Sequence, residues 1–164
     1  MKRKLSTITV VMSVLAVLVC GCATMQTIDI SSRSRIMNAD YTTTLQAAVD
    51  YLNSEGWQIA TVDREFGLVN TEFKSSSDLG SIFFGGERYK LNLSIQRFSA
   101  DQTRVIANML HETKSHGHLL GEGSWVQARL TEDDAVEQYY HLLSGLEAKL
   151  HSEKKGFSES RRAN

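Results

Sequence analysis

Three histidines and a glutamate lie close together at His111, Glu112, His116 and His118. Imidazole nitrogens and carboxylate oxygens bind Zn²⁺ and Cu²⁺, so this cluster could hold a metal ion if the loop after residue 114 folded back onto the preceding strand. The spacing differs from the HExxH pattern of zinc proteases, and Gly117 separates two of the histidines. Two interpretations stay open: a metal site at His111, His116 and His118, with pH sensing as a variant, or solvated loop histidines. The second is favoured.

No other pattern indicates catalysis. The serines lie in polar runs outside a GxSxG turn, and neither a GxGxxG pattern nor a P-loop occurs. The carboxylates of Glu132, Asp133 and Asp134 fit the first turn of a helix better than an acid/base pair. We therefore expect a protein that is not an enzyme, with no catalytic residue and no cofactor.

The N-terminus carries a different chemistry. Basic residues at 2–4 precede an apolar run at 5–19 and a small-residue junction, Cys20-Gly21-Cys22-Ala23, which is the order of a secretory signal peptide. The apolar run is shorter than the roughly 20 residues of a membrane-spanning helix. Because Gly21 precedes Cys22, the junction resembles a bacterial lipobox with Cys22 as the acylated residue. Cys20 fits the pattern less well.

The lipobox resemblance implies that residues 1–21 are removed and that Cys22 becomes a lipidated N-terminus. Ala23 then stands where an Asp retains such lipoproteins in the inner membrane of Gram-negative bacteria. The resemblance therefore implies the periplasmic face of the outer membrane. An uncleaved apolar anchor is the alternative, and it also places the domain outside the cytoplasm.

Charge and cysteine content narrow the class of partner. The chain has 18 Lys and Arg against 19 Asp and Glu, and three of the basic residues belong to the signal peptide, which leaves 15 against 19, or about −4. Phosphate binding needs a basic face, so nucleic acid is not expected as a partner. Both cysteines lie at the junction, so no disulfide is expected within the domain.

Hydrophobic periodicity predicts one domain over residues 40–153. Asp40 or a following threonine caps a helix over 41–54, which Gly56 ends. Strands are expected at 57–63, 68–74, 89–98 and 103–113, and residues 125–130 are either a fifth strand or a lead-in to a long helix that begins after Thr131. The fold class is therefore α+β, with an antiparallel sheet of four to five strands packed against an N-terminal helix and a long C-terminal helix.

The segments outside this pattern have separate expectations. Residues 22–39 are polar and are expected to be a tether, with an edge strand containing Ile28, Ile30 and Ile36 as the alternative. Residues 154–164 are charged and are expected to be a flexible tail.

The loop at 75–88 combines serines and glycines with the apolar triplet Ile82-Phe83-Phe84. Such a triplet is unusual in a merely disordered loop. It either closes the end of the core or contacts a partner protein or a bilayer surface.

Two stretches carry a wider resemblance. The helix–turn–hairpin sequence GWQIATVDREFGLVNTEF and the ending EQYYHLLSGLEAKL resemble the helix-grip domains of small Gram-negative outer-membrane lipoproteins of the BamC-like type. The resemblance implies a non-catalytic interaction or scaffold module that binds envelope proteins. The long extended segment by which BamC contacts its partner is not matched here. A carrier of a lipid or other hydrophobic ligand, with Ile82, Phe83 and Phe84 as its lid, is the alternative function. The oligomeric state is left open.

Overall fold

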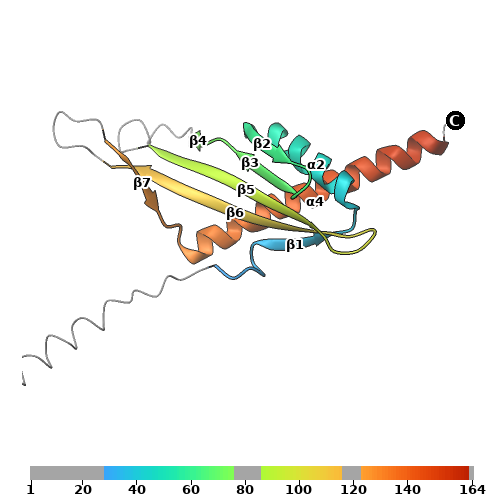
Figure 1. Ribbon diagram of the computed structural model, residues 1–164, viewed down its shortest axis with the longest axis horizontal. Helices are drawn as coiled ribbons and strands as arrows, with labels where there is room; N and C mark the ends of the chain where they lie inside the picture. Colours follow the sequence, from blue (N-terminus) through green and yellow to red (C-terminus); the bar gives the residue numbers. More distant parts are fainter. Residues whose placement is uncertain (1–27, 76–85, 116–122, 163–164) are drawn as a thin grey trace, which may run out of the picture.

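The computed structural model describes residues 28–75, 86–115 and 123–162. These residues form an α+β fold in which an antiparallel sheet packs against two helices (Figure 1). In chain order, the elements are β1 (Ser34–Met37), α2 (Tyr41–Ser54), β2 (Ile59–Asp63), β3 (Leu68–Thr71), β4 (Lys74–Ser75), β5 (Glu87–Arg97), β6 (Thr103–Lys114), β7 (Trp125–Ala128) and α4 (Glu132–Arg162).

The sheet of the described residues has seven strands, more than the four to five expected. Its order is β1-β6-β5-β3-β2, while β4 pairs with β5 and β7 pairs with β6 at the other end of these two long strands. The expected strand 68–74 is divided because its pairing with β5 stops at Asn70 and resumes only at Lys74, in β4. The Glu72 amide instead donates a hydrogen bond of 2.8 Å to the carbonyl of Gln58.

β1 corrects the expectation of a tether over residues 22–39 where residues 34–37 are concerned. It forms an edge strand on β6, with Ser34 opposite Ile106 and Met37 opposite Thr103. The alternative of an edge strand was right, but its buried side chain is that of Met37, which is fully buried. Ile30 and Ile36, which the alternative had named, are 52% and 39% exposed.

α2 has the predicted bounds because its ends are encoded locally. The Asp40 carboxylate accepts hydrogen bonds from the amides of Thr42 and Thr43 at 3.0 and 3.1 Å. Gly56 ends the helix with a φ of 77°, a conformation that glycine adopts without steric cost. Leu45, Ala48 and Leu52 form its buried face.

α4 is longer than expected, since it continues through most of the segment predicted to be a tail and ends at Arg162. At its start, the hydroxyl of Thr131 accepts from the amide of Asp134 at 3.2 Å and donates to its carboxylate at 2.5 Å. The buried side chains of α4 recur at spacings of three and four, at Ala135, Tyr139, Leu143, Leu146 and Leu150.

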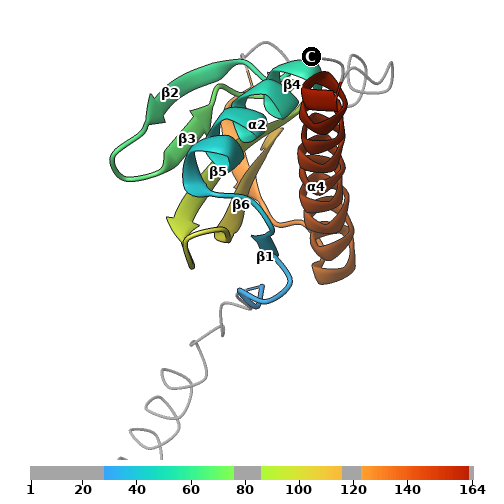
Figure 2. The ribbon, with the colours of Figure 1, turned by 90° about the vertical axis from the view of Figure 1, so that its right-hand side faces the viewer.

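Both helices lie on the same face of the sheet (Figure 2). The alternation of side chains along β5 and β6 places Leu91, Leu93, Ile95, Val105 and Ala107 on this face, and all five are buried. The core therefore fills the space between the sheet and the two helices. No helix in the described ranges is long and apolar enough to cross a membrane.

Candidate functional site

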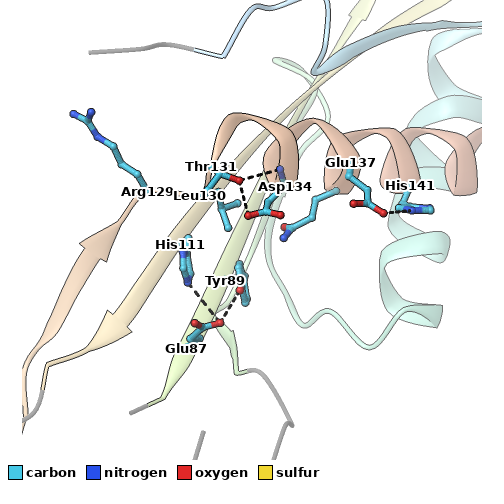
Figure 3. A pocket seen from close by; sticks show the side chains of 10 residues that line it. Glu87, Tyr89, His111, Arg129, Leu130, Thr131, Asp134, Glu137 and His141 are labelled. Atoms are coloured by element: carbon cyan, nitrogen blue, oxygen red, sulfur yellow. Dashed lines mark hydrogen bonds and ion pairs between the residues drawn. The ribbon is translucent and has the colours of Figure 1, made fainter. Parts of the chain in front are cut away.

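A pocket of about 500 Å³ lies at the start of α4, beside the first residues of β5 and the last part of β6 (Figure 3). β5 contributes Glu87 and Tyr89, and β6 contributes His111, which is the cross-strand partner of Tyr89. The first turns of α4 contribute Asp134 and Glu137.

The alternation of the strands explains why this end of the inner face is polar. On β5 the inward series Ile95, Leu93 and Leu91 continues to Tyr89 and Glu87. On β6 the corresponding series passes from apolar residues to His111. The apolar core therefore ends at the first turns of α4, and a polar pocket takes its place.

His111 is the most buried polar group of the pocket. The residue is 8% exposed, and its ring stacks on that of Tyr89 with centroids 4.6 Å apart and planes at 6°. Neither ring nitrogen has a hydrogen-bond partner among the described residues. Nε2 lies 3.8 Å from Oε2 of Glu87, too far for a hydrogen bond. Leaving such a group unsatisfied costs about 1–3 kcal/mol.

Tyr89 lies near negatively charged side chains. Its hydroxyl donates a hydrogen bond of 2.9 Å to Oε2 of Glu87. Burial raises the pKa of Tyr89 to about 12, helped by this hydrogen bond and by the charges of Glu87 and Asp134. Among the described residues that line the pocket, the one arginine is Arg129, and it points away from the other labelled side chains (Figure 3). Carboxylates therefore dominate the electrostatics of the pocket.

The structure separates two residues of the histidine cluster that the sequence placed side by side. His111 faces the pocket, whereas Glu112 lies on the opposite face of β6, where its carboxylate binds Arg88 through Nε at 2.7 Å and Nη2 at 2.6 Å. His116 and His118 lie outside the described residues. Within the described ranges, no group of three His, Cys, Asp or Glu side chains is placed to hold a metal ion.

Arg88 forms a second cluster, on the outer face of the sheet. Its guanidinium carbon lies 4.1 Å from the ring centroid of Phe73 and 4.2 Å from that of Trp125. The Glu112 carboxylate binds the guanidinium group through Nε and Nη2. These contacts connect the segment before β4 to β5, β6 and β7. The cluster therefore packs these segments together at the end of the sheet that carries the pocket.

The other predicted site residues, Cys22, Ile82, Phe83 and Phe84, lie outside the described residues. Conversely, sequence reasoning missed Glu87, Tyr89, Glu137 and His141 as pocket residues. One signal was available: the inward positions of β5 and β6 change from aliphatic to polar at Tyr89 and His111, which marks the end of the core.

Compared with known proteins, the chain matches no family model and no curated protein.

Proposed function

We propose that the chain is a lipid-anchored protein on the periplasmic face of the bacterial outer membrane, and that its α+β domain is a non-catalytic binding module for envelope proteins. The observation that carries this proposal is the lipobox-like junction at Cys22. Several acyl chains, at about 0.8 kcal/mol per buried CH₂, would make release from the membrane negligible.

Because β1 begins at Ser34, only a short segment would connect the lipidated Cys22 to the folded domain. Only about a dozen residues separate Cys22 from Ser34, the first residue of β1, and such a segment spans at most roughly 40 Å when fully extended. Because β1 is hydrogen-bonded to β6, the domain would stay close to the membrane surface. Partners embedded in or attached to the same membrane would then be within its reach.

The arrangement of the helices supports the finer fold proposal. Two helices on one face of an antiparallel sheet agree with a helix-grip-like domain, which the hairpin and C-terminal helix sequences also resemble. We extend the BamC-like resemblance to this chain on these grounds.

Two cysteine variants test the anchor. Cys22→Ser should leave an unprocessed precursor that takes up no radiolabelled palmitate. Cys20→Ser, the matched control, should be processed, acylated and found in the outer-membrane fraction. Acylation of the Cys22→Ser protein would refute the assignment, and a Cys22→Ser protein that stays in the membrane without acylation would support the uncleaved apolar anchor.

Photocrosslinking tests the binding role. A photoreactive amino acid at Phe84 in whole cells should give a discrete protein adduct, and the same group at Asp50, on the polar face of α2, should not. Adducts to lipid alone would instead favour the carrier of a hydrophobic ligand.

The carrier alternative receives less support from the geometry. A lipid chain needs a cavity lined by apolar side chains. The pocket at the start of α4 is lined mostly by polar and charged groups, so it suits a polar ligand.

A further inference from the structure

We propose that the pocket at the start of α4 binds an organic cation, the ammonium or guanidinium group of a ligand such as a lysine or arginine side chain or a free polyamine. This inference deepens the proposed binding role, and it rests on that role only for the source of the cation.

Glu87 is the anchor for such a cation. Its side chain is 47% exposed, and Oε2 accepts the hydrogen bond from Tyr89. No hydrogen bond to its other oxygen, Oε1, is formed within the described residues. Asp134 and Glu137 supply further negative charge from α4, across the pocket from Glu87 (Figure 3).

His111 is the second, independent observation. It is more than nine-tenths buried, lines the pocket, and has both ring nitrogens unpaired within the described part of the chain. Oε2 of Glu87 lies 3.8 Å from Nε2, and the Glu87 side chain is about half exposed. A ligand N–H group that binds the Glu87 carboxylate could then also donate to an unprotonated ring nitrogen of His111. Binding would satisfy a buried polar group that has no partner within the described residues.

The same residues disfavour an anion. A helix N-terminus usually attracts negative charge. Here Glu132, Asp133 and Asp134 already occupy the first turn, and Thr131 satisfies the amide of Asp134. Within the pocket, an anion would meet the carboxylates of Asp134 and Glu137 together with that of Glu87. A positively charged ligand is therefore the complement of this pocket.

NMR on the full-length chain in non-ionic detergent tests the proposal. Histidine rings are labelled with ¹³C, and the His111 signal is assigned by its loss in a His111→Gln variant. Nα-acetyl-lysine amide, spermidine and inorganic phosphate are titrated separately at pH 7. We expect a saturable shift of the His111 signal with at least one of the two amines and none with phosphate. Saturation by the lysine derivative alone would point to a protein side chain, and saturation by spermidine alone to a free polyamine.

Three variants that each remove one negative charge make the test specific. Glu87→Gln keeps an acceptor for Tyr89 but removes the charge, and we expect it to weaken binding about tenfold, or about 1.4 kcal/mol. Glu147→Gln removes the same charge from the part of α4 that binds Arg35 and should leave the affinity unchanged. Glu137→Gln is a second pocket variant and should weaken binding less, because this side chain is 72% exposed.

Three results would overturn the proposal: no saturable shift with either amine, equal affinity in the folded Glu87→Gln protein, or tighter binding of phosphate than of the amines. Each is independent of the lipid anchor, whose failure would appear in the fractionation of the cysteine variants.

Discussion

The ring of Tyr51 on α2 occupies the space that a β-carbon on Gly145 of α4 would need. A methyl group added to Gly145 would lie 2.9 Å from Cε2 of Tyr51 and closer still to its hydroxyl oxygen. The two helices therefore approach each other at a point where one of them has no side chain. Glycine within a helix costs about 1 kcal/mol relative to alanine, so close packing has to compensate for its presence.

Gly145→Ala should therefore lower the free energy of unfolding by about 1–3 kcal/mol, because overpacking outweighs the gain in helix propensity. Chemical denaturation followed by circular dichroism measures this change. In a Tyr51→Ala background, the same substitution should be neutral or stabilising. A stabilising effect of Gly145→Ala alone would show that the two helices do not pack as described.

A pair of neighbouring substitutions tests whether β1 belongs to the folded domain. Met37→Ala should lower the free energy of unfolding by about 2–5 kcal/mol, since the Met37 side chain is fully buried in the core. Ile36→Ala, on the same strand but with its side chain on the outer face, should cost clearly less. Equal and small effects of both substitutions would mean that β1 is not part of the stable domain and that the tether prediction holds for this segment.

The Arg88 cluster should contribute more than an exposed ion pair. Arg88→Met leaves the Glu112 carboxylate, which is 18% exposed, without its partner and removes two cation–π contacts. We expect a loss of about 2–4 kcal/mol in thermal or chemical unfolding. Arg88→Lys should recover only part of this loss, because a lysine cannot bind the carboxylate and stack between two rings in the same way. The control, Arg129→Met at an exposed position, should change stability by less than about 0.5 kcal/mol.

Tyr89 should titrate with a pKa of about 12, which difference absorbance at 295 nm against a Tyr89→Phe variant can measure. Glu87→Gln should lower this pKa only in part, since burial is its largest cause. The neutral phenol is favoured in the folded state, so its contribution to stability is complete below about pH 10 and is lost as the pH rises toward about 12. A Tyr89 that titrates near pH 10 would mean that the pocket is open to water.

Local signals in the sequence determined much of the fold. Asp40 and Gly56 define both ends of α2 because caps act through hydrogen bonds between near neighbours. The strict alternation from Tyr89 to Ile95 assigned the buried face of β5, since successive side chains of a strand point to opposite faces. Together they were enough to predict an α+β domain with an antiparallel sheet.

Tertiary structure alone decided the rest. β1 is a segment of four residues, two of them polar, and it is a strand only because β6, far along the chain, offers hydrogen-bonding groups along its edge. The pocket likewise needs Glu87, His111 and Asp134 from three separate elements. Such contacts depend on strand register and on where α4 begins over the sheet. Short-range sequence patterns do not encode the strand register or the position of α4 over the sheet, because both are set only when the whole core has packed.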